Sequence, residues 1–354
     1  MMTSKERALR VLARQEADRI AIDFDIEPGM DIIQRVGDAL GVVGEEAVLI
    51  ALNVDFRNTV VYTSASIPAK PYDETRLMNA WGALIDKRYG TATGHPLAEA
   101  VTMEEADRHT YLDPDAVDYD AIERSASGQD KYCVYGGYWA PITYIAQMLL
   151  GMDRYMMLFY DDPDLLCFVL DRITDIALEV NKRIFKRLGT KMQVFFMGDD
   201  YGTQQDLLTS PEQWRTYIKP RLKRLVDFAL DSGYLVQFHS CGSISELIPD
   251  FVDLGVSCMN PMQVAARGMD PQSLKSRFGD VMSFNGGIDT QDLLPFGTPE
   301  DVRQAVIKTL EIMSPGGGYI LGPSQSFLPE VPTGNILAIY KAADQFIGSS
   351  RRAT

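Results

Sequence analysis

Short apolar segments alternate with longer amphipathic segments along most of the chain. Runs such as "VFFM" and "YLVQF" seldom alternate with polar residues, which is typical of strands buried on both faces of a parallel sheet. The segments between them carry apolar residues at helical spacing. The predicted strands lie at residues 131–139, 192–200, 234–242, 256–263, 281–289 and 319–326, and the main predicted helices at residues 142–159, 163–188, 210–233, 243–255, 270–279, 298–318 and 332–348.

The first third of the chain is less regular. Residues 3–15 are predicted to form a helix, because Thr3 and Glu6 have the spacing of a capping box and apolar residues follow at helical intervals. The stretch "IAIDFDIEPG" alternates apolar and acidic residues and ends in Pro-Gly, which predicts a strand and a turn. Residues 60–115 contain scattered proline, glycine and aspartate, so we expect loops and a short hairpin there.

Regular alternation of strands and helices favours an α/β protein, either a doubly wound sheet or a (β/α)8 barrel. No G-x-G-x-x-G follows the first strand, so the dinucleotide-binding form of the doubly wound sheet has no support. The predicted strands end instead in polar or glycine-rich residues, namely "GDD", "HSCG", "NPMQ", "NGGID" and "GPSQS". Such ends are typical of the catalytic rim of a TIM barrel. The sequence therefore predicts one (β/α)8 barrel domain over residues 1–354, with an irregular insertion around residues 60–115.

Charge and composition exclude several classes of function. The 354 residues carry a formal net charge of −15 and no long run of lysine and arginine, which disfavours nucleic acid as a partner. No stretch is long and apolar enough for a membrane span, and the first residues lack the apolar core of a signal peptide. The four cysteines form no C-x-x-C pair, so we expect free thiols and a cytoplasmic location.

One His-x-Cys pair stands at the end of a predicted strand. His239 and Cys241 are alternate residues of an extended segment, so both side chains can face one ion, and imidazole and thiolate are ligands that zinc prefers. Gly242 follows and admits a close turn. The alternative is that the pair merely packs inside the barrel. We predict that His239 and Cys241 bind a metal ion.

Further polar residues stand at the other strand ends. Asp199 and Asp200 follow "VFFM" and are predicted to be catalytic, as base, ligand or substrate anchor; the alternative is that one of them caps the helix near Ser210 or ties down the following loop. Amide and carboxylate groups on the later strand ends are candidates for substrate contact, although turn chemistry of the Asx type explains some of them equally well. These candidates are Asn260, Gln263, Asn285, Asp289 and Gln325.

Several segments, in this order, resemble the uroporphyrinogen decarboxylase superfamily. They are "FHSCGSISELIPDFVDLGV", "NPMQ", "FNGGIDTQDLLPFGTPEDVRQAV" and "GGGYILGPS", and the resemblance extends from "SKERALRVLARQEADRI" to the last helix. It implies a single (β/α)8 barrel with its site at the carboxyl-terminal mouth of the strands.

The superfamily contains two chemistries. The true decarboxylases carry an Arg-Gln-Ala-Gly-Arg-Tyr type segment after the first strand, whose arginines hold the substrate's carboxylates. Here no arginine lies between Arg19 and Arg35, and three acids, Asp23, Asp25 and Glu27, stand in that region. Such acids would repel a porphyrinogen polycarboxylate.

The second branch is the corrinoid-dependent methyltransferases, of the methylcobamide:coenzyme M and O-demethylase types. Their signature is His-x-Cys and a later Cys, all bound to zinc. His239 and Cys241 match its first part, but Ser324 and Gln325 stand where the later Cys is expected. A third ligand would then have to come from Asp199, Asp200 or another carboxylate.

The resemblance implies zinc-assisted transfer of a methyl group between a small-molecule donor or acceptor and a corrinoid. No Asp-x-His-x-x-Gly motif occurs, so we expect the corrinoid on a separate small partner protein. A monomer or homodimer is expected from relatives. Two alternatives stay open: decarboxylation of a porphyrinogen or another carboxylated substrate, with an aspartate stabilising the pyrrole cation, and a non-catalytic barrel that binds a tetrapyrrole or a corrinoid protein.

Overall fold

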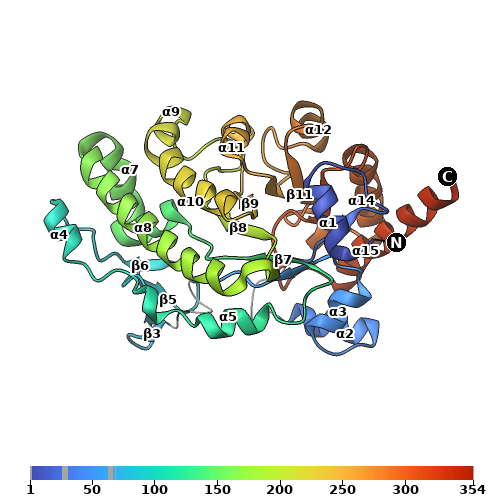
Figure 1. Ribbon diagram of the computed structural model, residues 1–354, viewed down its shortest axis with the longest axis horizontal. Helices are drawn as coiled ribbons and strands as arrows, with labels where there is room; N and C mark the ends of the chain where they lie inside the picture. The colour runs from blue at the N-terminus through green and yellow to red at the C-terminus, as the bar shows by residue number, and fades with distance from the viewer. Residues whose placement is uncertain (1, 26–30, 63–66, 68, 354) are drawn as a thin grey trace.

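The computed structural model describes residues 2–25, 31–62, 67 and 69–353 (Figure 1). Within them, eight parallel strands form a nearly closed barrel in the order β1-β12-β11-β10-β9-β8-β7-β2. This confirms the predicted TIM-barrel architecture. The strands are β1 (Ala21–Ile22), β2 (Phe56–Asn58), β7 (Cys133–Gly136), β8 (Val194–Gly198), β9 (Leu235–His239), β10 (Cys258–Met262), β11 (Ser283–Ile288) and β12 (Tyr319–Pro323).

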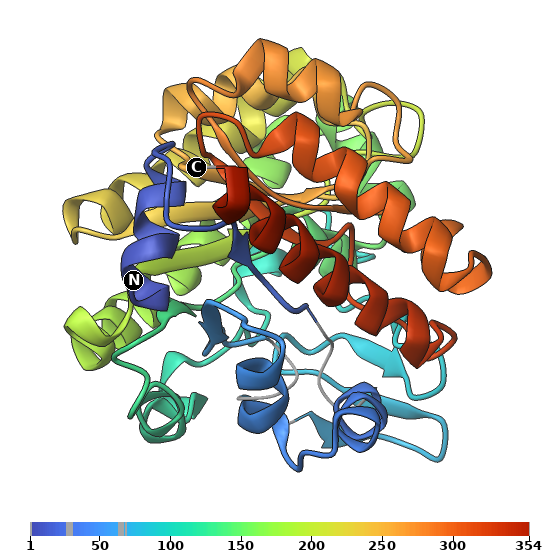
Figure 2. The ribbon, with the colours of Figure 1, turned by 90° about the vertical axis from the view of Figure 1, so that its right-hand side faces the viewer.

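Helices surround this barrel, and the last of them crosses in front of it in Figure 2. Capping follows the sequence: the Thr3 and Glu6 capping box begins the first helix, and Ser210 caps the helix that starts at Pro211. The α-helices are α1 (Ser4–Leu12), α2 (Ile32–Leu40), α3 (Glu45–Ala51), α4 (Met103–Asp107), α5 (Tyr119–Ser125), α6 (Ile142–Leu150), α7 (Met152–Asp161), α8 (Pro163–Leu188), α9 (Pro211–Gln213), α10 (Lys219–Asp231), α11 (Ile248–Leu254), α12 (Pro271–Phe278), α13 (Leu293–Phe296), α14 (Pro299–Met313) and α15 (Thr333–Ala353). A π-helical segment, Trp214–Ile218, joins α9 to α10, and short 3-10 turns occupy Pro114–Ala116 and Gly189–Lys191.

The insertion after β2 is more ordered than the sequence predicted. It holds a four-stranded antiparallel sheet in the order β3-β4-β5-β6, followed by α4. The strands are β3 (Lys70–Pro71), β4 (Arg76–Met78), β5 (Leu84–Asp86) and β6 (Ala92–Gly94). Because each has only two or three residues, period-two alternation is too short to stand out from the surrounding proline, glycine and aspartate.

Helix α1 closes the amino-terminal end of the barrel. Its apolar residues, Ala8, Val11 and Leu12, pack in one cluster with the interior residues at the start of the strands. The hydroxyl of Ser283 in β11 donates to the carbonyls of Val11 and Leu12 at 3.2 Å. Because this end is filled by apolar side chains, a ligand can enter only from the opposite, carboxyl-terminal mouth.

The barrel is closed between β1 and β2 by a side chain. These two strands share one backbone bond, from the Asp55 amide to the Ile22 carbonyl at 2.9 Å. The buried Asp55 carboxylate accepts from the Ile22 amide at 3.0 Å, from Arg7 at 2.7 Å and from Arg19 at 2.8 Å. At this position a charged hydrogen-bonded network therefore holds the two strands together, whereas backbone hydrogen bonds between strands do so elsewhere in the barrel.

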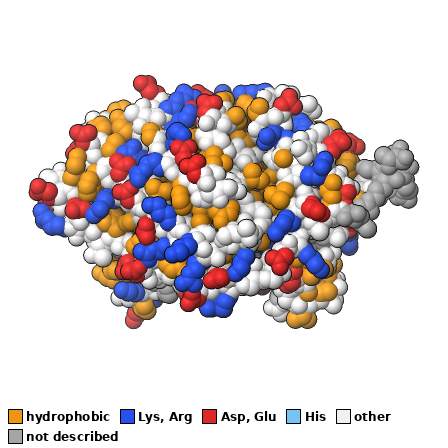
Figure 3. Space-filling model, in the orientation of Figure 1, with side chains coloured by type: hydrophobic (Ala, Val, Ile, Leu, Met, Phe, Trp, Pro, Cys, Tyr) orange, Lys and Arg blue, Asp and Glu red, His pale blue; other side chains and the backbone are white. Residues whose placement is uncertain are grey.

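The face shown in Figure 3 mixes acidic, basic and apolar side chains without a continuous basic area. Within the described residues, no helix is long and apolar enough to cross a membrane.

We expect Asp55→Ala to lower the free energy of unfolding by about 3–5 kcal/mol, because it leaves the largely buried Arg19 without its carboxylate and Arg7 with Asp18 alone. Urea unfolding followed by circular dichroism measures this. The matched control is Asp227→Ala, which removes the carboxylate of an exposed Lys223–Asp227 pair and should change stability by less than about 1 kcal/mol. Equal effects of the two substitutions would contradict the role given to Asp55.

Candidate functional site

The barrel interior changes from apolar to polar about halfway along the strands. Strand β9 shows the pattern: successive side chains alternate between the two faces, so Gln237 and His239 face the interior while Phe238 packs on Phe251 of α11. Asn260 on β10, Asn285 on β11 and Asp23 just after β1 add to the polar part. Buried polar side chains at the mouth of a TIM barrel mark the place where a ligand binds.

Three potential metal ligands converge at the mouth. Asp200, His239 and Cys241 each offer a ligand atom, and these atoms lie within 4.8 Å of one another. His239 Nε2 is 3.4 Å from Cys241 Sγ and 3.8 Å from Asp200 Oδ1. The structure thus brings the two predicted metal-binding residues together, with Asp200 beside them.

These distances fit a zinc ion. Zn–N bonds of about 2.0–2.1 Å and Zn–S bonds of about 2.3 Å at a tetrahedral angle place the nitrogen and sulfur about 3.6 Å apart. The His239 side chain is 11% exposed, whereas the Asp200 side chain is 57% exposed. Three protein ligands with one open side are the arrangement of catalytic zinc sites, which keep a position for water or substrate.

Two amides orient the candidate ligands. His239 Nδ1 lies 2.7 Å from Asn260 Oδ1, so the ring donates its Nδ1 proton to the amide oxygen and leaves Nε2 free to bind an ion. Gln325 Nε2 donates to Cys241 Sγ at 3.4 Å. Gln325, one of the two residues in the region where the resemblance led us to expect a later Cys, therefore contacts the sulfur of Cys241.

The surroundings of Cys241 favour its protonated form when no ion is bound. Burial raises the pKa of this thiol, and the carboxylates of Asp200 and Asp25 raise it further. A metal ion bound here would have to displace the thiol proton, because thiolate is the form that coordinates metals.

The loops after β8 and β9 are bound to each other at several points. The Cys241 amide donates to Asp200 Oδ1 at 2.8 Å, and the Ser243 amide donates to the Thr203 carbonyl at 2.7 Å. Gly242 has a φ of +86°, and a Cβ there would lie 2.4 Å from the backbone of Gly202. A side chain at Gly242 would push the two loops, and the ligands on them, apart.

Asp199 has a different position from Asp200. It is 3% exposed, and its carboxylate accepts from the amides of Thr143 and Tyr144, at the start of α6. Burial raises its pKa to about 7. The sequence allowed that one of the two aspartates caps a helix; Asp199 does so, but for α6 rather than for the helix near Ser210.

Of the remaining predicted residues, some hold other parts of the site in place and one forms a backbone turn. Gln263 Oε1 accepts from the Gly242 amide at 2.6 Å and so holds the loop that carries Cys241. Asn285 Nδ2 donates to Asp23 Oδ2 at 2.8 Å inside the barrel. Asp289 accepts from the backbone amides of residues 291–293, which is the turn chemistry that the sequence offered as the alternative. Whether any of them contacts a substrate stays a prediction.

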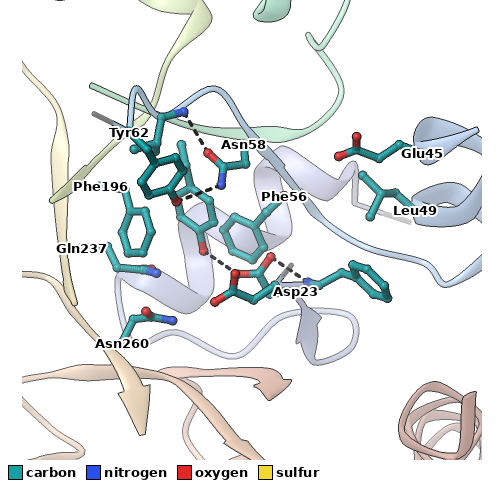
Figure 4. Close-up of a pocket in the computed structure, with 13 residues that line it drawn as sticks. Asp23, Glu45, Leu49, Phe56, Asn58, Tyr62, Phe196, Gln237 and Asn260 are labelled. Carbon is teal, nitrogen blue, oxygen red and sulfur yellow. Dashed lines mark hydrogen bonds between the residues drawn. The ribbon is translucent and has the colours of Figure 1, made fainter. Parts of the chain in front are cut away.

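A pocket of about 210 Å³ lies beside this cluster and is called the acidic pocket here (Figure 4). Asp23, Asp25 and Glu45 line it together with the amides of Asn58, Gln237 and Asn260. Burial raises the pKa of Asp23 to about 6, although hydrogen bonds from Asn285 and Tyr135 oppose the rise. Glu27, the third acid of the first strand segment, lies outside the described residues.

Gln237 was not singled out by the sequence analysis. The signal was present, because Gln237 is a polar residue inside an apolar run and lies two positions before His239, hence on the same face. A second pocket, of about 300 Å³, is lined by His239, Asp200 and Trp139, among others.

Comparisons with known proteins agree with this architecture. Residues 75–346 match the family model described as uroporphyrinogen decarboxylase (URO-D). The methylated-thiol–coenzyme M methyltransferase of Methanosarcina mazei is 25% identical over 187 residues, 52% of this chain and 47% of that protein. The uroporphyrinogen decarboxylase of Pseudoalteromonas translucida is 24% identical over 243 residues, 64% of this chain and 62% of that protein. The chain thus spans about half the length of the first relative and less than two thirds of the second.

A solved methyltransferase from Methanosarcina mazei superposes with a TM-score of 0.67, covering 98% of this chain and 99% of that one. At 22% identity this likeness confirms the fold alone. The family model, by contrast, matches well over half of the chain in sequence. The chain therefore belongs to the uroporphyrinogen decarboxylase (URO-D) family.

Proposed function

We propose that the chain catalyses a zinc-assisted methyl transfer between a small-molecule donor or acceptor and a corrinoid carried by a separate protein. The observation that carries the proposal is the convergence of Asp200, His239 and Cys241 at the barrel mouth, with ligand atoms within 4.8 Å. The coenzyme M methyltransferase among the relatives supports the same class of reaction.

Zinc bound there would supply Lewis-acid chemistry, lowering the pKa of a thiol or hydroxyl or polarising an ether oxygen. The chain's own residues prepare the site. Asn260 fixes the ring of His239 by accepting a hydrogen bond from its Nδ1–H, and Gln325 donates a hydrogen bond to the sulfur of Cys241. Asp200, the more exposed of the two adjacent aspartates, would supply the third ligand, whereas Asp199 is occupied with α6.

The decarboxylase alternative is less well supported by the described part of the pocket. A porphyrinogen with several carboxylates needs cationic partners, yet none of the described residues that line the acidic pocket is a lysine or an arginine. Two like charges about 4 Å apart repel by about 4 kcal/mol near a protein surface. Uroporphyrinogen should nevertheless also be tested as a substrate, because one relative is named for its decarboxylation.

The chain as purified from a zinc-containing medium should contain one zinc per molecule, measured by mass spectrometry of the metal content. With 2-mercaptoethanol as acceptor and free methylcobalamin as donor, it should convert methylcobalamin to its Co(I) form, which absorbance follows. His239→Ala and Cys241→Ala should each lose the zinc and reduce this rate by at least about 100-fold, because two protein ligands do not hold the ion.

The matched control is Cys167→Ala, which removes a thiol on α8 and should keep both zinc and activity. A metal-free native chain whose methyl transfer survives both substitutions at His239 and Cys241 would contradict the proposal. Turnover of uroporphyrinogen without methyl transfer would favour the decarboxylase, and binding of methylcobalamin without any turnover would favour a non-catalytic barrel.

Gln325→Cys should tighten zinc binding by at least about tenfold, since Gln325 already contacts Cys241 and a thiolate is a better zinc ligand than an amide. Competition with a chromogenic chelator measures the affinity. Ser324→Cys is the control, because the Ser324 hydroxyl is buried and accepts from the Thr290 amide at 3.2 Å instead of facing Cys241. Tighter zinc binding in Ser324→Cys but not in Gln325→Cys would contradict the assignment of position 325 as the one that faces the metal ligands.

A further inference from the structure

The acidic pocket contains a buried amide with no partner. Gln237 is completely buried, and neither its Nε2 nor its Oε1 has a hydrogen-bond partner among the described residues. It lines the pocket, and in Figure 4 its amide extends toward Asp23 and Asn260. Because buried polar groups in folded proteins are almost always paired, an unpaired amide facing a cavity indicates a polar ligand.

Two carboxylates of the same pocket accept hydrogen bonds from neighbouring donors. Asp23 accepts three hydrogen bonds: from Asn285 at 2.8 Å, from the Tyr135 hydroxyl at 3.2 Å and from the Phe24 amide at 2.9 Å. Such donors favour the ionised form of a carboxyl group. Asp25 accepts from the Ser326 hydroxyl at 3.0 Å.

No lysine or arginine among the described residues forms an ion pair with these acids. The ion pairs of the described residues do not include Asp23, Asp25 or Glu45, and the described lining of the pocket holds neither lysine nor arginine. The pocket therefore attracts a positive ligand and repels a carboxylate or a sulfonate.

Aromatic rings form another part of the lining. Phe56 stacks on Tyr135 with ring centroids 4.7 Å apart, and Phe196 follows at 5.3 Å from Tyr135. The faces of such rings attract cations, and their apolar area suits the carbon skeleton of a small molecule.

We propose that the acidic pocket binds an ammonium group at one end of the small-molecule substrate, so that the substrate is a small cationic amine. The inference rests on the proposed methyl transfer for the role of the other end. Asn260 lines the pocket and bonds to His239, so a molecule anchored by its ammonium group extends toward the candidate metal ligands. The ammonium protons donate to Asp23, Asp25 and Gln237 Oε1.

Three probes that share a methylthio group and differ in charge test this: 2-(methylthio)ethylammonium, the neutral 2-(methylthio)ethanol and the anionic 3-(methylthio)propanoate. Isothermal titration calorimetry of the full chain at pH 8, with and without zinc, gives their affinities. We expect the cation to bind at least tenfold more tightly than the other two in both states of the protein, because the preference comes from the pocket and not from the metal. Equal affinities, or a preference for the anion, would overturn the inference.

Variants of the pocket separate its role from general effects on folding. Asp25→Asn should weaken binding of the cation about tenfold and leave the neutral probe unchanged. Gln237→Met keeps the size and removes both polar atoms without breaking any existing hydrogen bond, so it should fold and also weaken the cation severalfold. Glu330→Gln, which removes an exposed acid of the loop after β12 that does not line this pocket, is the control and should bind all three probes like the native chain. Undiminished binding of the cation to Gln237→Met and Asp25→Asn would refute the assignment.

The outcomes distinguish this inference from the proposed function. A preference for the cation without methyl transfer from methylcobalamin would keep the ammonium pocket and refute the methyltransferase. Zinc-dependent methyl transfer without a preference for the cation would keep the methyltransferase and refute the ammonium pocket.

Discussion

The closure of the barrel depends on the carboxylate of Asp55. The first and last strands of the sheet order, β1 and β2, share a single backbone bond, and Asp55 adds bonds to the Ile22 amide, Arg7 and Arg19. Through Arg7 the same carboxylate fixes α1, the helix that fills the amino-terminal end. A barrel transmits the position of each strand to the next, so this buried network sets the relative positions of strand ends on the far rim. It is stable because every charge in it is paired.

The mouth of the barrel carries groups that do not stabilise the fold. An unpaired buried amide such as that of Gln237 costs about 1–3 kcal/mol. Asp23 also opposes folding at neutral pH, because its pKa in the folded chain is raised to about 6 and the carboxyl group must ionise in a buried position. The apolar amino-terminal half of the barrel, packed on α1, offsets these costs in folding free energy. Local instability supported by a well-packed scaffold is characteristic of binding sites.

The fold and part of the site could be predicted from sequence because both depend on short-range patterns. Alternate residues of a strand face one side, so His239 and Cys241 were expected to face one ion, and His239 Nε2 lies 3.4 Å from Cys241 Sγ. Sequence could not decide between Asp199 and Asp200, because adjacent residues diverge and the direction of each depends on α6, whose start Asp199 caps. Asp289 was ambiguous for a similar reason: an aspartate after a strand suits a ligand and a turn equally.

Gln237 was overlooked because sequence does not show whether a side chain has hydrogen-bond partners. Only the three-dimensional packing shows that no described group pairs with its amide. The small sheet of the insertion was missed because its strands are too short for a periodic pattern. Both features depend on how distant segments of the chain come together, which local sequence patterns do not show.

The contact between the loops after β8 and β9 has a mechanical consequence. Gly202 and Gly242 touch backbone to backbone, and further hydrogen bonds join the loops on either side of that contact. Any displacement of one loop as a molecule enters the mouth must carry the other with it. The two loops would thus move as one unit, and the spacing between Asp200 on one loop and Cys241 on the other would be kept.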